Sequence, residues 1–173
     1  MKLIAFTAKC QDYDITDQYE KCDVRCFDLR VRFDAEGNPI ICHGIVEYKH
    51  NVADLMGWLR WLDSKGDVVV RVLHEARNEK QYNELTKDLF IWFCGTLEEE
   101  FPNIKFWCGK NLYNWEVDYE FSYDPSCEEK YASVCPPKLI DDWYPRLYAT
   151  IMNDRNKEKG TDKDILLIDF VNI

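Results

Sequence analysis

Three side chains in this sequence have the chemical type and the position that a functional site requires. Two of them, Asp28 and Arg30, lie two residues apart in the apolar run Cys26–Phe33. Because side chains alternate along a strand, Asp28 and Arg30 are expected to point to the same side. A charged pair on a buried strand costs free energy unless its members pair with each other or bind a ligand. Both interpretations remain open from the sequence.

The third side chain is the imidazole of His43. His43 and Gly44 directly follow the strand-like run 39–42, which predicts an imidazole at the carboxyl end of a strand. Parallel α/β proteins bind their ligands at that end of their strands. The alternative is a histidine that is merely exposed or hydrogen-bonded within the fold.

The apolar pattern indicates which elements position these residues. Runs with strand character occupy residues 26–33, 39–42, 68–73, 104–108 and 165–171. Amphipathic stretches predict helices over residues 52–62, over 81–100, and from Lys138 or Asp141 to about Asn153. Strands that are apolar almost throughout and alternate with helices predict an α/β fold, in which helices cover a mainly parallel sheet.

Composition limits the size of the fold and its partners. The chain has 173 residues, 46% of them hydrophobic, and a formal net charge of −10, which predicts a single domain over residues 1–173. This length argues against a complete eight-stranded β/α barrel, which usually takes about 250 residues. The acidic balance, without any basic stretch, argues against nonspecific binding to nucleic acid or anionic lipid. We expect a monomer that makes at most transient membrane contact.

The start of the chain bears on location. Polar residues from Lys9 onward interrupt its short apolar run, so it is not typical of a signal peptide. No apolar run reaches the ~20 residues of a membrane span. The sequence as written predicts a cytoplasmic protein, and a signal segment lost upstream would instead predict secretion.

Eight cysteines raise the question of disulfides or zinc. Cys26, Cys42, Cys94 and Cys108 lie inside apolar runs, which is typical of buried, reduced thiols. No Cys-x-x-Cys pair occurs, and the closest pair, Cys22 and Cys26, has no histidine nearby. We therefore expect structural thiols, with no metal and no other cofactor.

An ordered set of short motifs extends this interpretation. The motifs are ITDQ at 15–18, VRCFDLRV at 24–31 and GNPIICHG at 37–44, with weaker similarity at 54–62, 67–75 and 166–170. Their combination resembles the X-domain of bacterial-type phosphatidylinositol-specific phospholipases C, members of the phospholipase C-like phosphodiesterases. This resemblance implies a partial or distorted TIM-type β/α barrel that cleaves a phosphodiester of inositol or a related lipid head group.

The resemblance also implies roles for individual residues. His43 matches the histidine that protonates the leaving group, and imidazole suits acid–base work near neutral pH. Arg30 matches the phosphate-binding arginine, whose guanidinium can engage two phosphate oxygens. Asp28 matches the acidic residue near this arginine, which has an orienting or electrostatic role. Calcium-dependent relatives carry an acidic residue in place of Arg30, so no calcium is expected.

Two further matches are looser. His74 lies near the position of a phosphate-binding lysine, although Leu73 fits that position equally well. Asp169 matches the acid on the last strand that partners the catalytic base, and the other interpretation is a polar residue that closes a strand. Together the predicted site is catalytic at His43, Asp28 and Asp169 and phosphate-binding at Arg30 and His74.

The main departure from the family lies at the amino terminus. The family's general base is a histidine in a Gly-Thr-His-Asp type motif on the first strand, and no histidine precedes His43 here. The barrel is therefore expected to lack its first strand, because the start of the reading frame was lost or because the protein is a degenerate relative. Loss of a general base typically slows catalysis by about 10² to 10⁴, so we expect impaired phosphodiesterase activity.

Two other functions remain open. The first is a non-catalytic module that binds phosphate or a phosphorylated polyol through Arg30. The second is an interaction protein that uses its tryptophans, which are Trp58, Trp61, Trp92, Trp107, Trp115 and Trp143. Most of these lie on predicted helix faces or strands, where packing in the core is the expected role.

Overall fold

The computed structural model describes residues 13–43, 46–76, 81–108, 119–123, 131–133 and 165–167, together with positions 147, 149–151, 153–154 and 158. The chain divides into two compact units. One combines Met1–Val24 with Pro125–Ile173, and the other is Arg25–Asp124.

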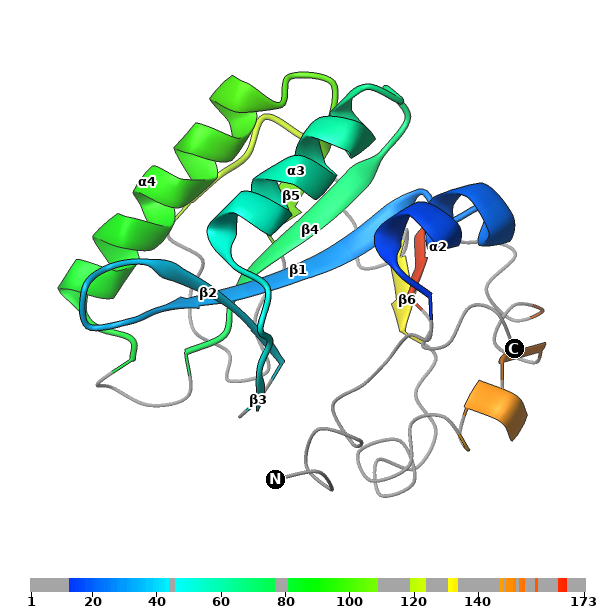
Figure 1. The fold of residues 1–173 in the computed structure, drawn as a ribbon, viewed down its shortest axis with the longest axis horizontal. Coiled ribbons are helices and arrows are strands. Elements are labelled where there is room, and N and C mark those ends of the chain that lie inside the picture. Colours follow the sequence, from blue (N-terminus) through cyan, green and yellow to red (C-terminus); the bar gives the residue numbers. More distant parts are fainter. Residues whose placement is uncertain are drawn as a thin grey trace. The chain divides into compact units, whose positions relative to one another are not determined.

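Unit Arg25–Asp124 is built on a mixed β-sheet (Figure 1). Its described strands are β1 (Cys26–Phe33), β2 (Pro39–His43), β3 (Val46–Glu47), β4 (Val69–His74) and β5 (Lys105–Cys108). They lie in the order β3-β2-β1-β4-β5. Strand β1 pairs with β4 in parallel, as β4 does with β5, whereas the pairs β1–β2 and β2–β3 are antiparallel.

The expected mainly parallel sheet of a partial or distorted TIM-type barrel is therefore wrong. The described strands form a small, open mixed sheet, and the fold class is α+β rather than α/β. The physical reason is the short connection at residues 34–38, because a tight turn can join only antiparallel strands. Asp34 organises this turn by accepting hydrogen bonds from the backbone of Glu36 and Asn38, and Gly37 adopts a positive φ of 85°.

Two helices cover one face of this sheet (Figure 1). They are α3 (Val52–Asp63) and α4 (Glu84–Glu100), and each begins with a capping box, at Asn51 and Asn83 respectively. Apolar residues on one side of each helix are buried, and these are Leu55, Leu59 and Leu62 in α3 and Phe90, Phe93 and Leu97 in α4. The two helix predictions are confirmed, with α4 starting at Glu84 because Asn83 caps it.

The register of β1 and β4 separates two faces. Leu29 pairs with Val72 and Val31 with His74, alternating with the pairs Asp28–Arg71 and Arg30–Leu73. Val31 and Val72 are fully buried, and Phe33, next on that face of β1, packs edge-on against Phe93 of α4. Asp28, Arg30 and Arg71 therefore lie on the opposite face of the sheet, here called the polar face.

The second unit contains α2 (Ile15–Cys22), β6 (Tyr131–Ser133) and β7 (Ile165–Leu167). Asp14 caps the start of α2, and β6 pairs with β7 in parallel. Asp169 and the start of the chain lie outside the described residues, as does most of the predicted helix from Lys138 or Asp141 to Asn153.

Among the helices of the described residues, none combines the length and the apolar character needed to cross a membrane.

Candidate functional site

The candidate site is a charged cluster on the polar face, centred on Asp28. Its Oδ1 accepts a hydrogen bond from Arg71 Nε at 2.6 Å, and its Oδ2 accepts one from Arg30 Nε at 2.7 Å. Asp28 and Arg71 are register partners on the parallel strands β1 and β4, and Arg30 lies two residues further along β1. One carboxylate thus joins two guanidinium groups through their Nε atoms.

Glu75 completes the cluster. Its Oε2 lies 3.5 Å from Arg30 Nη1, and its side chain is only 1% exposed. The backbone N–H of Glu75 donates to Val31 O at 2.8 Å, which fixes the residue just beyond the end of β4. Arg30 therefore lies between two carboxylates, with a short contact to Asp28 and a longer one to Glu75.

Burial and charge together set the protonation of Asp28. Burial acts to raise its pKa, but the charges of Arg30 and Arg71 and the hydrogen bonds from both act in the other direction and prevail. The pKa of Asp28 is therefore lowered from its ordinary 3.8, and the carboxylate is ionised at neutral pH. Side-chain exposure is 26% for Asp28, 17% for Arg30 and 9% for Arg71, so the cluster reaches the surface at Asp28 and Arg30.

Trp107 supports Arg71 from the neighbouring strand. The two residues are register partners on β4 and β5, and the Arg71 guanidinium carbon lies 5.8 Å from the centre of the Trp107 ring. That distance is within the range of a cation–π interaction. Both side chains are buried, so the orientation of Arg71 is restricted by Asp28 and by the indole.

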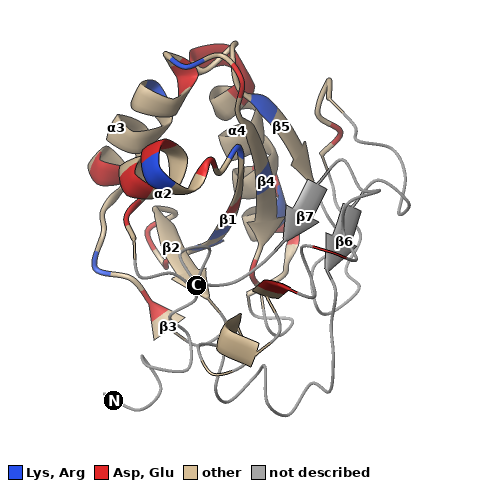
Figure 2. Ribbon diagram, turned by 90° about the vertical axis from the view of Figure 1, so that its right-hand side faces the viewer, with Lys and Arg blue, Asp and Glu red and all other residues tan. Residues whose placement is uncertain are grey.

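A second ion pair lies on the same face. Arg32 Nη2 contacts Glu47 Oε1 at 2.7 Å, which links β1 to β3. Arg32 is as buried as Arg71, but its ion pair is made with Glu47 on β3 rather than with Asp28. Arg32 is therefore a matched control for the arginines of the cluster. Basic residues on β1 and β4 are blue in Figure 2.

His43 ends β2, as the sequence predicts, but its surroundings differ from the expectation. Across β2 and β3, Cys42 pairs with Glu47 and His43 with Val46. Because Glu47 bonds to Arg32 on the polar face, Cys42 belongs to that face and His43 to the helix-covered face. Strand β2 also runs antiparallel to β1, so its carboxyl end is directed away from the end of β4 where Glu75 lies.

His74 also belongs to the helix-covered face. Its ring stacks on Phe90 with centroids 5.2 Å apart, and it contacts Phe33 and Tyr82 at 5.7 and 5.6 Å. Leu73, the other match to the family's lysine, is the register partner of Arg30 on the polar face. The structure brings Asp28 and Arg30 together and separates His74 from them, and Asp169 lies outside the described residues.

Sequence reasoning missed Arg71 and Glu75. Both lie in or beside a strand whose sequence is mostly apolar, and nothing in the one-dimensional pattern pairs them with Asp28 and Arg30. The available signal was the alternation of side chains along β4, which places Arg71, Leu73 and Glu75 on the same side of the strand. Using it required the register between β1 and β4.

Four cysteines of this unit are free thiols in the structure. Cys42 and Cys94 are buried, as their apolar runs predict, whereas Cys26 and Cys108 are only half-buried. Burial raises the pKa of Cys26 and of Cys42 to about 12. Within the described ranges, no group of three or more His, Cys, Asp or Glu side chains is arranged to hold a metal ion.

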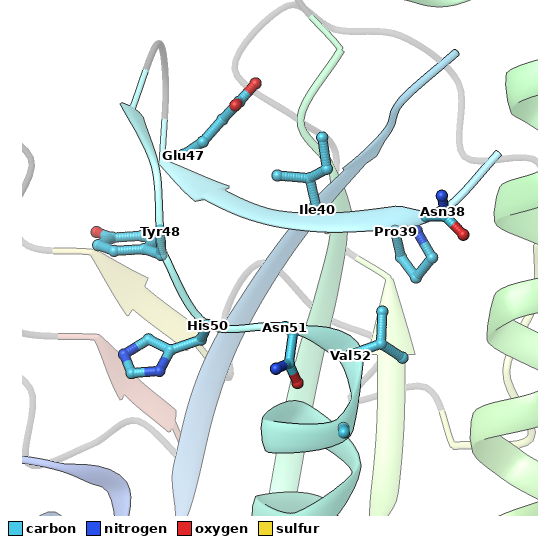
Figure 3. Close-up of a pocket in the computed structure, with 9 residues that line it drawn as sticks. Asn38, Pro39, Ile40, Glu47, Tyr48, His50, Asn51 and Val52 are labelled. Atoms are coloured by element: carbon cyan, nitrogen blue, oxygen red, sulfur yellow. The ribbon is translucent and has the colours of Figure 1, made fainter. Parts of the chain in front are cut away.

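A shallow hollow of about 550 Å³ lies elsewhere, between β2 and the start of α3 (Figure 3). Its lining residues are Asn38, Pro39, Ile40, Glu47, Tyr48, His50, Asn51, Val52 and Ala53. His50 is held there against the ring of Trp58, with centroids 4.7 Å apart. The predicted site residues Asp28, Arg30 and His43 do not line this hollow.

Comparison with known proteins finds no family model and no curated protein that matches the chain.

Proposed function

We propose that this protein binds the phosphate group of a small phosphorylated molecule through Arg30, with Asp28 holding the guanidinium in position. The contact between Asp28 Oδ2 and Arg30 Nε carries this proposal. A guanidinium fixed through Nε is pre-oriented, and a pre-oriented group loses less conformational entropy when it binds an anion. The resemblance to phospholipase C X-domains supports a phosphorylated polyol such as an inositol phosphate.

The charge of the protein narrows the ligand class. A net charge of −10 repels anions at long range, so attraction must come from contacts at the site itself. The exposed part of the cluster is small, which favours a compact anionic group over an extended polyanion. These two observations support a small phosphorylated molecule rather than nucleic acid.

Thermal denaturation in the presence of inorganic phosphate tests this proposal. A ligand at about ten times its dissociation constant stabilises the folded state by about 1.4 kcal/mol. For a chain of this size that raises the Tm by roughly 3–6 °C. Sodium chloride at equal ionic strength controls for general salt effects.

Three variants make the test specific to the site. Arg30→Lys keeps the positive charge but loses the planar fork, so the phosphate-dependent shift should fall to a small part of its wild-type value. Arg30→Gln should abolish it. Arg32→Gln, which removes a more deeply buried arginine of the same face, should keep it. An unchanged shift in both Arg30 variants, or no shift in the wild type, contradicts the proposal.

A second candidate is cleavage of the phosphodiester, as in the family that the motifs resemble. The observation that favours it is the adjacency of β2, which ends at His43, to β1, which carries Asp28 and Arg30. In this proposal His43 protonates the leaving alkoxide while Arg30 holds the phosphate oxygens. The register assigns His43 to the opposite face, so turnover requires β2 to shift its register or its end to twist.

Incubation with phosphatidylinositol and with a soluble inositol phosphodiester tests this candidate. Cleavage should be slow, because the sequence has no second histidine that matches the family's base, and it should disappear in His43→Ala. The control is His50→Ala, which changes an exposed imidazole outside the cluster. Equal turnover by wild type and His43→Ala, or no turnover at all, refutes the catalytic role of His43 without affecting phosphate binding.

A further inference from the structure

We infer that Arg30 and Arg71 form a two-guanidinium clamp, bridged by Asp28, that prefers a phosphomonoester dianion to a phosphodiester monoanion. This inference rests on the proposed phosphate site and adds a specificity to it. Sequence reasoning assigned phosphate binding to Arg30 and not to Arg71. The new element is that one carboxylate brings the two guanidinium groups to the same place.

The backbone explains why the two groups converge. Arg71 is the register partner of Asp28, and Arg30 is two residues further along the same strand, so all three side chains leave the sheet on one face. Asp28 accepts from Arg71 Nε with one oxygen and from Arg30 Nε with the other, at 2.6 and 2.7 Å. The two oxygens of one carboxylate are close together, so both guanidinium heads are anchored within a few ångströms.

The clamp is largely preformed. Arg71 is 9% exposed and lies over the ring of Trp107, itself buried. Arg30 is held by its short contact with Asp28. Immobilising a long side chain on binding usually costs about 0.5–1.5 kcal/mol, and much of that cost is already met in the folded protein.

Ligand chemistry then gives the preference. A phosphomonoester above its second pKa of about 6 carries close to two negative charges on three strong acceptor oxygens. A phosphodiester carries one charge on two such oxygens. Two guanidinium groups compete less for the three oxygens of a monoester than for the two oxygens of a diester. The hydrogen bonds from each guanidinium are also stronger to the more highly charged monoester. The monoester should therefore bind about tenfold more tightly, which is the effect of one additional charge-assisted hydrogen bond.

Methyl phosphate and dimethyl phosphate are matched probes for this preference. Binding is measured by calorimetry at about pH 7.5 and again at about pH 5, on either side of the monoester's second pKa of about 6. Methyl phosphate should bind about tenfold more tightly than dimethyl phosphate at the higher pH and lose most of this advantage at the lower one. Dimethyl phosphate has no second ionisation, so any change in its affinity between the two pH values comes from the protein and not from the ligand.

Variants assign the preference to Arg71. Arg71→Gln should reduce methyl phosphate binding to the level of dimethyl phosphate, and Arg71→Lys, which keeps the charge and so protects folding, should retain part of the preference. The matched control, Arg32→Gln, should keep all of it. Circular dichroism confirms that each variant is folded.

Three outcomes would overturn the inference. Equal affinity for both esters, with binding still lost in Arg30→Gln, removes the dianion preference but leaves phosphate binding at Arg30. A preference that survives both Arg71 variants removes the role of Arg71. Binding of neither ester removes the clamp together with the proposed phosphate site.

Discussion

Replacement of Asp28 by asparagine should destabilise the protein, and it should do so in a pH-dependent way. The Asp28→Asn variant keeps the size of the side chain but replaces the carboxylate with an amide. The amide oxygen can still accept one of the two Nε–H bonds, whereas the other becomes an unfavourable contact with the amide N–H₂. Arg30 and Arg71 would then face each other, and Glu75 would be the remaining anion of the cluster.

The size of the effect follows from these contacts. A hydrogen bond to a charged group contributes about 1.5–3 kcal/mol, and removing one partner of a buried ion pair typically costs about 3–5 kcal/mol. Asp28 is 26% exposed, so water can replace part of what is lost. We therefore expect Asp28→Asn to lower the free energy of unfolding by about 2–4 kcal/mol at neutral pH.

The pH dependence gives the sharper test. Because the folded-state pKa of Asp28 is lowered, its charge contributes stability above the pKa of the unfolded chain, which is about 3.9. That contribution is lost as the pH falls through the folded-state pKa. The difference in unfolding free energy between wild type and Asp28→Asn should thus be full at about pH 6–7 and should shrink below about pH 4.

Urea denaturation followed by tryptophan fluorescence measures both quantities. Asp67→Asn is a suitable control, because Asp67 also pairs with an arginine, Arg25, but is 53% exposed, and exposed pairs contribute about 0–1 kcal/mol. A difference between wild type and Asp28→Asn that is below about 1 kcal/mol, or that does not change with pH, would refute the account of the cluster.

Three further predictions concern single residues. Glu75→Gln should tighten phosphate binding in calorimetry, because Glu75 competes with an anion for Arg30, and weaker binding would mean that Glu75 instead orients Arg30. Gly37→Ala should lower the free energy of unfolding by about 1–2 kcal/mol, since φ is 85° there, with Gly57→Ala in α3 as the control that should be neutral or stabilising. Cys42 should resist alkylation in the folded protein at about pH 8, because burial raises its pKa to about 12, and rapid modification monitored by mass spectrometry would contradict this.

The sequence predicts the helices and strands of unit Arg25–Asp124 well, and their arrangement less well. Strands β1, β2, β4 and β5 and helices α3 and α4 were predicted to within a few residues, because continuous apolar runs and helical spacing are local properties. The barrel prediction failed at one connection. The run 39–42 has the composition of a buried parallel strand. Only the tight turn at 34–38 indicates that this strand pairs antiparallel to β1.

The candidate site shows a similar limit. The same-side placement of Asp28 and Arg30 follows from strand alternation and needs no tertiary information. Arg71 and Glu75 could not be added, because their relation to Asp28 depends on the register of β1 against β4. The face of His43 likewise depends on the pairing of β2 with β3. Residues joined by long-range pairing are thus the part that the sequence alone leaves undetermined.

The cluster itself argues for a role beyond structural stability. Two arginines and two carboxylates on a sheet face are together neutral, so they can satisfy one another without a ligand. Yet apolar residues of similar volume often fill such a place with equal or greater stability. The contacts are also unequal, since Asp28 binds both arginines at 2.6 and 2.7 Å while Glu75 lies 3.5 Å from Arg30. When an anion takes the place of Glu75 at Arg30, the protein loses the longer contact between Glu75 and Arg30 and keeps the two short contacts of Asp28. This asymmetry favours phosphate binding.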